Sequence, residues 1–241
     1  MITILDTEKE FDITAASRIV DQIIRKPDSV IGLSTGRTTG NMHKAIVKRF
    51  KKNPFDVAKT VFVGVDEITN VPKDYYGACY RMLRSELLDG LGIPDERFVI
   101  LPVQSDNYER DCRNYVKEIE DHGGVDLLIL GLGENGHLGF NQPFSPFEID
   151  AWVTDMNPEL LARVRNEVGN CSDYKGATMG LRLMMHSKRI ILAAKGRTKS
   201  LAVKCMIEGE ISNEFPASIL QMHPNCEFLL DKEAASMLKE Q

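Results

Sequence analysis

The chain alternates between stretches of helical hydrophobic spacing and short, continuous apolar runs. Apolar residues recur at helical intervals from Phe11 to Ile24, and similar spacing predicts further helices at about 41–51, 80–88, 108–120 and 199–208. Continuous apolar runs predict buried strands, at 30–33, 60–65, 98–101, 125–130, 189–194 and 227–230. Helices that alternate with such strands favour right-handed βαβ units. We therefore predict an α/β fold, a three-layer α/β/α arrangement with a mostly parallel, Rossmann-like sheet.

Residues 1–241 contain no visible boundary, so we expect a single domain. Residues 144–176 fit the alternation poorly, because they mix prolines, charges and scattered apolar residues without a clear period. We interpret this segment as a lid over a functional site, and the alternative is an ordinary surface connection.

Composition narrows the class of protein. With 43% hydrophobic residues, 27% charged residues and a net charge of −5, the sequence is typical of a globular protein and argues against binding to nucleic acid or membranes. The five cysteines are scattered without a C-x-x-C pair, which indicates neither a zinc site nor a disulfide framework. The amino terminus lacks the apolar region of a secretory signal, so we expect a cytoplasmic protein. The sequence leaves open whether the protein forms a homo-oligomer.

Residues 131–143 form a glycine-rich loop directly after the 125–130 run. Four glycines within nine residues let the backbone turn sharply and approach a ligand closely; they are Gly131, Gly133, Gly136 and Gly139. His137 is the natural acid-base candidate, and amide side chains surround it in sequence. Because open α/β sheets bind ligands at the carboxyl ends of their strands, we predict an active-site loop.

A second polar loop follows the 30–33 strand and precedes a helix. Its hydroxyls, backbone amides and helix amino terminus suit a phosphate dianion, and its residues are Ser34, Thr35, Gly36, Arg37, Thr38 and Thr39. The pattern matches neither G-x-G-x-x-G nor the P-loop, so it does not indicate a dinucleotide or a nucleoside triphosphate. The alternative is a turn in which Thr38 or Thr39 caps the helix.

Three further polar residues also follow predicted strands. Asp66 and Glu67 come directly after the 60–65 strand, where a carboxylate is suited to act as a general base or, alternatively, to cap the next turn. Lys199 lies after the 189–194 strand and near a helix start, where it either meets a phosphate or remains solvated. Because the carboxyl ends of parallel strands share one edge of a sheet, we expect Asp66, His137 and Lys199 to converge there.

These motifs, in this order, resemble the glucosamine-6-phosphate deaminase/isomerase family, within a wider group that includes the 6-phosphogluconolactonases. The similarity is clearest at 65–67, 133–141 and 216–224, and the Phe140-Asn141 pair favours the deaminase branch. The resemblance implies that Ser34 to Thr39 and Lys199 hold a sugar phosphate, with Glu67 grouped among the binding residues. It also implies that Asp66 moves a proton between C2 and C1.

The same resemblance makes His137 the group that assists opening of the pyranose ring, with Asn135 and position 142 beside it. It implies an ammonia-releasing, hydrolase-class reaction without cofactor or metal. A lid arginine, Arg163 or Arg165, is expected on the phosphate.

Two positions depart from the family pattern. Gln142 stands where the deaminases carry a glutamate, and an amide cannot supply that negative charge to His137; Glu148 is an alternative source of a carboxylate. Thr39 occupies the position after the phosphate-loop threonine, where family members often carry a proline. The leading hypothesis is therefore a deaminase/isomerase acting on glucosamine-6-phosphate or galactosamine-6-phosphate. The alternatives are a 6-phosphogluconolactonase-like hydrolase and a sugar-phosphate sensor without turnover.

Overall fold

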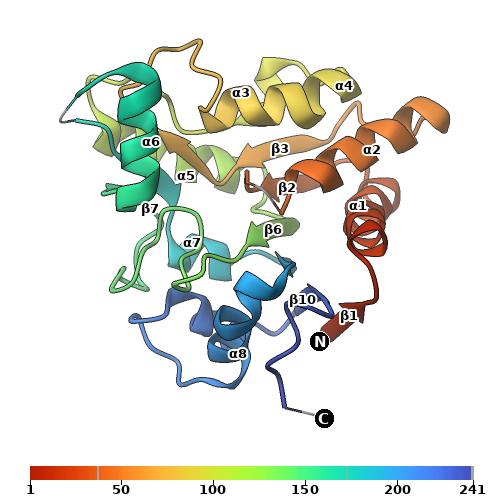
Figure 1. The fold of residues 1–241 in the computed structure, drawn as a ribbon. Coiled ribbons are helices and arrows are strands. Elements are labelled where there is room, and N and C mark those ends of the chain that lie inside the picture. The colour runs from red at the N-terminus through yellow and green to blue at the C-terminus, as the bar shows by residue number, and fades with distance from the viewer. Residues whose placement is uncertain (37, 172, 240–241) are drawn as a thin grey trace.

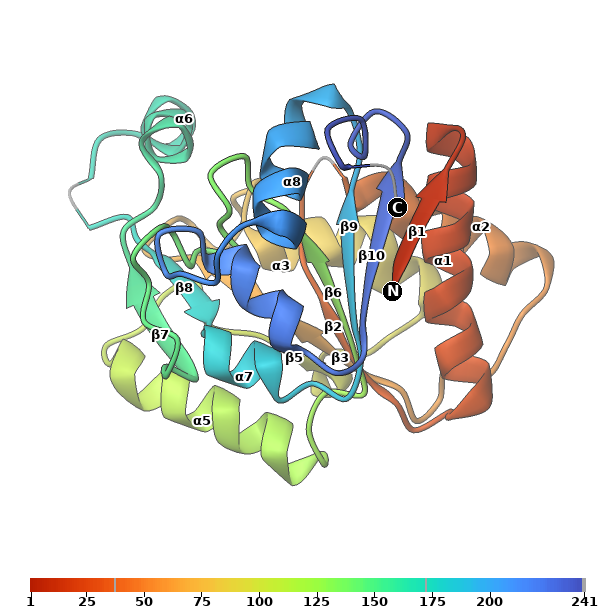
Figure 2. The same ribbon diagram turned by 90° about the horizontal axis from the view of Figure 1, so that it is seen from below.

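The structure is a computed structural model that describes residues 1–36, 38–171 and 173–239. Its centre is a parallel sheet of seven strands in the order β1-β10-β9-β6-β2-β3-β5 (Figures 1 and 2). In chain order the strands are β1 (Ile2–Leu5), β2 (Val30–Leu33), β3 (Val61–Gly64), β5 (Phe98–Val99), β6 (Leu127–Gly131), β9 (Ile190–Ala194) and β10 (Cys226–Asp231). The predicted α/β fold with a mostly parallel sheet is confirmed.

Helices cover both faces of this sheet (Figure 2). One face packs against α1 (Glu8–Arg25), α2 (Gly40–Lys52), α3 (Cys79–Leu83), the π-helical turn η1 (Arg84–Leu88) and α4 (Asp89–Leu91). The other face packs against α5 (Tyr108–Asp121), α7 (Leu181–Met185), α8 (Ser200–Glu208) and the 3-10 helix η4 (Pro216–Met222). Two short 3-10 turns, η2 (Asp95–Arg97) and η3 (Arg197–Lys199), precede β5 and α8.

Strand β6 shows why the apolar runs are continuous. Leu127 and Ile129 belong to the core on the α1 and α2 side, whereas Leu128 and Leu130 belong to the core on the α5 and α8 side. Successive side chains of a strand point to opposite faces, and both faces here are covered by helices. Each residue in turn is therefore buried, which makes every position apolar.

A second, smaller sheet lies beside the first and was not predicted. It joins β4 (Asp66–Ile68), β8 (Gly176–Met179) and β7 (Ala151–Thr154) in the order β4-β8-β7, with antiparallel pairing. The expected irregular segment 144–176 therefore contains β7 and the helix α6 (Pro158–Val168). Its periods were hidden because β7 is only half-buried and α6 buries one residue fully, Val164.

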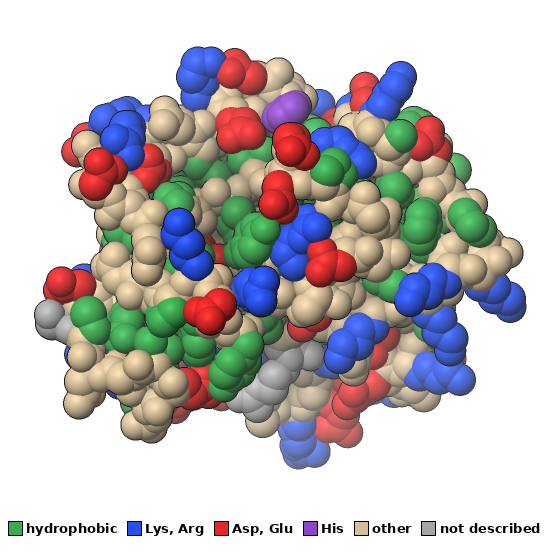
Figure 3. Space-filling model, turned by 90° about the horizontal axis from the view of Figure 1, so that it is seen from above, with side chains coloured by type: hydrophobic (Ala, Val, Ile, Leu, Met, Phe, Trp, Pro, Cys, Tyr) green, Lys and Arg blue, Asp and Glu red, His purple; other side chains and the backbone are tan. Residues whose placement is uncertain are grey.

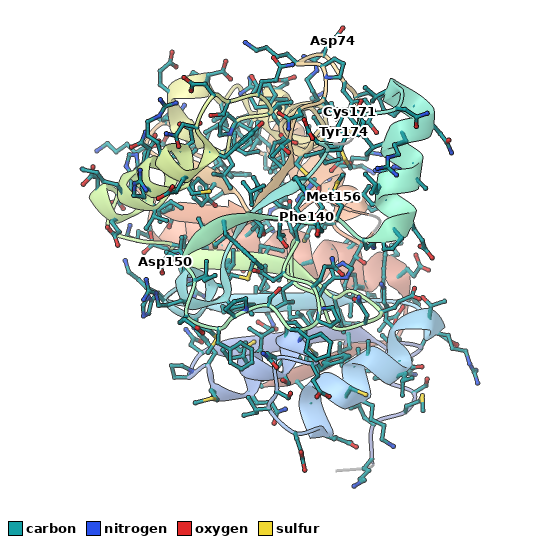
Figure 4. All side chains as sticks on the ribbon, turned by 90° about the vertical axis from the view of Figure 1, so that its left-hand side faces the viewer. Asp74, Phe140, Asp150, Met156, Cys171 and Tyr174 are labelled. Atoms are coloured by element: carbon teal, nitrogen blue, oxygen red, sulfur yellow. The ribbon has the colours of Figure 1, made fainter. Side chains whose placement is uncertain are left out.

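Helix α6 stands away from the central sheet and packs over a separate apolar cluster (Figures 1 and 2). Phe140, Met156 and Tyr174 lie together in this cluster, beside the segment that leads to α3 (Figure 4). Phe140 comes from the glycine-rich loop, so the cluster connects α6 to the loop that carries His137.

At the amino terminus, one strand was not predicted and one helix start was predicted too late. Strand β1 escaped notice because four residues are too few to show a period, although it pairs in parallel with β10 at the sheet edge. Helix α1 begins at Glu8 rather than near Phe11, because Thr7 and Glu10 form a capping box at its start. That signal was present in the sequence.

Candidate active site

The carboxyl ends of four neighbouring strands, β9, β6, β2 and β3, meet at one edge of the central sheet. The chain runs outward from β2 to β3 and β5, then returns to the other side of β2 as β6. Open α/β sheets bind ligands at such a reversal of strand order, because the loops there leave a crevice. The four polar loops singled out in the sequence follow these four strands.

A cavity of about 450 Å³ lies at this edge. The residues predicted from sequence that line it are Ser34, Thr35, Gly36, Thr38, Thr39, Asp66, His137 and Lys199. The expected convergence of Asp66, His137 and Lys199 is confirmed. The predicted binding residue Arg37 lies outside the described residues.

The loop after β2 presents hydroxyls and a helix amino terminus to the cavity. Thr39 precedes α2, yet its side chain makes no capping hydrogen bond to the helix; its hydroxyl instead donates to the carbonyl oxygen of Gly36 at 3.3 Å. The first amides of α2 therefore lack a side-chain cap from Thr39, which contradicts the alternative interpretation for that residue. Uncapped amides at a helix start favour an anion.

Among the described residues, three cationic side chains line the same cavity: Arg163 from α6, Lys195 directly after β9, and Lys199 at the start of α8. Lys195 pairs with Asp12 at 3.0 Å, and Lys199 lies 3.7 Å from a carboxylate oxygen of Glu134. Of the two expected lid arginines, Arg163 lines the cavity and Arg165 does not. Lys195 was not singled out, although its position at a strand end matches the rule applied to Lys199.

Asp66 supplies the buried carboxylate of the cavity. Its side chain is 8% exposed, and its Oδ1 atom has no hydrogen-bond partner among the described residues. Burial raises the pKa of Asp66 to about 6, and the Cys79 thiol opposes that rise as a hydrogen-bond donor. A carboxylate that titrates near neutrality is suited to take and return a proton.

The Glu67 side chain is turned away from the cavity, although the family resemblance groups it with the binding residues. Its Oε1 accepts the backbone N–H groups of Ile68 and Cys79, and its Oε2 accepts that of Tyr80, each at 2.7 Å. Adjacent residues of a strand face opposite ways, so Asp66 in β4 points to the cavity while Glu67 points into the start of α3. Burial raises the pKa of Glu67 to about 7, although these three donors act in the opposite direction.

The imidazole ring of His137 is held by Asn135, and Asn135 is held in turn by Gln142. Its Nδ1 lies 2.7 Å from Oδ1 of Asn135, which also accepts the backbone N–H of His137 at 3.3 Å. Because an amide oxygen only accepts, Nδ1 carries the hydrogen and Nε2 keeps its lone pair. Asn135 is fixed in turn, since its Nδ2 donates to Oε1 of Gln142 at 3.1 Å. Asn135 and Gln142 thus support His137 without lining the cavity themselves.

The charge state of His137 follows from its surroundings. Burial and the positive charge of Lys199 lower the pKa of His137 to about 4, and Glu134 is the carboxylate that acts in the opposite direction. Glu148, the alternative source of a carboxylate, acts electrostatically on Arg182 instead. The imidazole is therefore neutral at pH 7.

The glycines of the loop have a steric role as well. A side chain at Gly133 would lie 2.2 Å from Nδ1 of His137, so only glycine allows the ring to pack against the backbone. Asn141 fixes the far end of the loop, because its Nδ2 donates to the carbonyl oxygens of Leu138 and Met179 and its Oδ1 accepts the indole N–H of Trp152. The buried Asn141 is thus a structural anchor.

The face of the molecule drawn in Figure 3 carries both signs of charge, interspersed rather than gathered into one basic region. Among residues 1–36, 38–171 and 173–239, no group of three or more His, Cys, Asp or Glu side chains is arranged to hold a metal ion. No helix in those ranges combines the length and apolar character needed to cross a membrane.

The sequence matches the family model for glucosamine-6-phosphate isomerases and 6-phosphogluconolactonases over residues 7–228. The chain belongs to this family. A glucosamine-6-phosphate deaminase of Clostridium botulinum (strain Langeland / NCTC 10281 / Type F) is 36% identical over 240 residues, which cover 99% of this chain and 98% of the relative. The deaminase of Halothermothrix orenii is 32% identical over 239 residues, covering 98% and 99%.

Solved structures agree with this membership of the deaminase/lactonase family. A monomeric glucosamine-6-phosphate deaminase superimposes with a TM-score of 0.92 and 30% identity, covering 98% of this chain and 99% of that one. The 6-phosphogluconolactonase of Trypanosoma brucei superimposes with a TM-score of 0.78 and 20% identity, covering 99% and 98%. The likeness to the lactonase shows a shared fold alone.

Proposed function

We propose that this family member is a glucosamine-6-phosphate deaminase, which converts an amino-sugar 6-phosphate into the ketose 6-phosphate and ammonia. The observation that carries the proposal is the placement of the Asp66 carboxylate, with a pKa of about 6, in one cavity with a neutral imidazole and an anion-binding loop. The relatives named above support it, because two are glucosamine-6-phosphate deaminases that match nearly the whole chain.

The phosphate of the substrate is assigned to the loop after β2. The hydroxyls of Ser34, Thr35 and Thr38 supply hydrogen-bond donors, the amino terminus of α2 supplies the positive end of a helix dipole, and Lys199 supplies a positive charge. Arg163 would close over the phosphate from α6. Anchoring the phosphate at one end of the cavity holds the sugar carbons at a fixed distance from Asp66.

His137 is assigned to ring opening. Its Nε2 lone pair takes the proton of the anomeric hydroxyl as the bond between C1 and the ring oxygen breaks, and the imidazolium then returns that proton to the ring oxygen. The hydrogen bond from Nδ1 to Asn135 keeps the required tautomer throughout. With a pKa of about 4, His137 is neutral when the reaction begins, so its lone pair is available to act as a base.

Asp66 is assigned to the isomerisation. Its carboxylate removes the proton from C2 of the open-chain amino aldehyde, and the enol-type intermediate is protonated at C1 by the same group. This transfer gives an imine at C2. Water adds to that carbon and ammonia leaves, so the ammonia-releasing step is hydrolysis of an imine.

We further propose that residues 1–241 act as one domain, because the cavity draws on loops from Ser34 to Lys199. Segment 144–176 would be its lid, since α6 contributes Leu160 and Arg163 to the cavity wall. Whether the hydroxyl at C4 must be that of glucosamine or of galactosamine is decided by comparing the two substrates.

The test is to incubate the purified protein with glucosamine-6-phosphate, galactosamine-6-phosphate and 6-phosphogluconolactone, and to follow ammonia, ketose phosphate and lactone opening separately. We expect ammonia and ketose phosphate in equal amounts from an amino sugar, and a loss of about 10²- to 10⁴-fold in Asp66→Asn. Lactone opening without ammonia would replace the proposal by a hydrolase. Thermal stabilisation by the sugar phosphates without any turnover would replace it by a sensor.

A further inference from the structure

A buried cysteine thiol lies between the anion-binding loop and the Asp66 carboxylate. Cys79 is the first residue of α3, is 4% exposed, and lines the cavity together with Thr35 and Asp66. Apart from its effect on the pKa of Asp66, the assignments made so far give this thiol no role. Its neighbours on both sides belong to the site.

The position of the thiol is fixed by Glu67. The backbone N–H of Cys79 donates to Oε1 of Glu67 at 2.7 Å, and Glu67 is the chain neighbour of Asp66. One residue of β4 therefore holds the backbone of Cys79 while the adjacent residue presents its carboxylate to the cavity. The distance between thiol and carboxylate follows from this short covalent connection rather than from flexible loops.

The hydrogen-bonding direction is set by Thr35. Its hydroxyl donates to Sγ of Cys79 at 3.4 Å, so the thiol's own hydrogen is free to point elsewhere. Asp66 Oδ1 is buried and accepts no hydrogen bond from the described residues. Burial and the two neighbouring carboxylates raise the pKa of Cys79 well above its usual range, so the thiol keeps its hydrogen and stays a donor. The available acceptor is the Asp66 carboxylate.

We propose that Cys79 is a positioning residue for Asp66, and that the series Thr35, Cys79, Asp66 links the phosphate-binding loop to the proton-transferring carboxylate. The inference rests on the proposed function for the meaning of that link. A thiol is a weak donor, so it orients the carboxylate while leaving it basic enough to attack a C–H bond. A phosphate that orders Thr35 would thereby also order the base.

The test compares Cys79→Ala, Cys79→Ser and the matched control Cys112→Ala, which removes a buried thiol on α5 that does not line the cavity. The main readout is the titration midpoint of the Asp66 carboxyl carbon in ¹³C-aspartate-labelled protein, measured by NMR without substrate. Cys79→Ala should raise the midpoint by about half a pH unit, because the ionised form loses a donor. Cys79→Ser should restore it or lower it further, and Cys112→Ala should leave it unchanged.

Turnover gives a second readout. The kcat/KM of Cys79→Ala should fall about twofold at pH 6 and little at pH 8, as a raised Asp66 midpoint requires. In a double-mutant cycle, Thr35→Val should shift the midpoint in wild-type protein but not in the Cys79→Ala background.

Equal midpoints in wild-type and Cys79→Ala protein, both folded by their melting curves, would overturn the inference. A shift that Cys79→Ser fails to reverse would overturn it as well, because a hydroxyl keeps the donor. The NMR titration needs no catalysis, so it separates this result from the proposed function: absence of ammonia release by the wild type counts against the deaminase, whatever the midpoints show.

Discussion

The hydroxyl of Tyr75 donates to Oε2 of Glu167 at 2.6 Å, which connects the segment before α3 to the helix α6. Glu167 lies on the same helix as Arg163, so this bond holds the helix that contributes Leu160 and Arg163 to the cavity wall. The contact joins residues 92 positions apart in the chain. Helix α6 is also attached through Tyr76, which interacts with Glu167 as well, and through the apolar cluster around Val164.

Tyr75→Phe should loosen α6 without unfolding the protein, because the apolar cluster remains. We expect amide hydrogen exchange in residues 158–168 to become a few-fold faster, measured by mass spectrometry. Tyr80→Phe is the control, since the hydroxyl of Tyr80 donates a hydrogen bond to Asp95 rather than to a residue of α6. Unchanged exchange in α6 would show that the Tyr75 bond does not restrain it.

Glu67→Gln should destabilise the fold although it preserves size. The amide has one acceptor oxygen and places an NH₂ group against a backbone N–H, so at least one buried donor at the start of α3 is left unsatisfied. We expect the free energy of unfolding to fall by about 1–3 kcal/mol, measured by urea denaturation. Glu118→Gln on the exposed face of α5 should have almost no effect. Equal stability of the two variants would contradict the capping role.

Asp66→Asn should stabilise the protein, and increasingly so as the pH rises. Burial raises the pKa of the Asp66 carboxyl to about 6 in the folded state. Its contribution to stability is therefore fully present at a pH below the pKa of the unfolded chain, and it is lost as the pH rises through 6. The gain in unfolding free energy of the variant over wild type should therefore grow by about 1–3 kcal/mol between pH 4 and pH 8. A gain that is constant over this range would mean that Asp66 is not desolvated.

Gln142→Glu should raise the pKa of His137 from about 4 toward its ordinary value, because a negative charge is added beside Asn135. The imidazole titration, followed by ¹H–¹⁵N NMR, measures this shift directly. Gln142→Met is the matched control, since it removes the acceptor for Asn135 without adding charge. If both variants titrate alike, position 142 acts through geometry alone.

Arg163→Gln should weaken substrate binding, and Arg165→Gln should not. Both arginines are exposed residues of α6, but only Arg163 lines the cavity. We expect KM for the amino-sugar phosphate to rise about tenfold or more in Arg163→Gln, with kcat less affected, as for loss of a charged phosphate contact. Competitive inhibition by inorganic phosphate should weaken in parallel. Equal KM values for the two variants would remove Arg163 from the phosphate site.

Much of the site was predictable because each loop follows a strand that the sequence marks clearly. Residues 127–130, directly before Gly131, are all apolar, so the strand, its carboxyl end and the loop with His137 could all be placed. Lys199 and the loop at Ser34 were found by the same reasoning. The lid was not predictable in this way, since β7 and α6 bury too few side chains to leave a period.

The roles of Asp66 and Glu67 show the limit most clearly. Both are acidic residues after an apolar strand, and no local signal distinguishes them. Their directions are set by β4, in which Asp66 pairs with Thr178 and Glu67 with Ala177, more than a hundred residues away. That pairing turns Asp66 into the cavity and Glu67 toward α3. The same pairing also positions Cys79, because Glu67 accepts its backbone N–H.

By itself, the sequence determined the alternating elements, the parallel sheet and the edge at which the polar loops meet, because hydrophobic period and chain order are local properties. Only the tertiary structure decided which side chains reach the cavity. The choice between Asp66 and Glu67, between Arg163 and Arg165, and between Gln142 and Glu148 depends on contacts between distant segments. Such contacts are chosen by packing and register, which no short stretch of sequence contains.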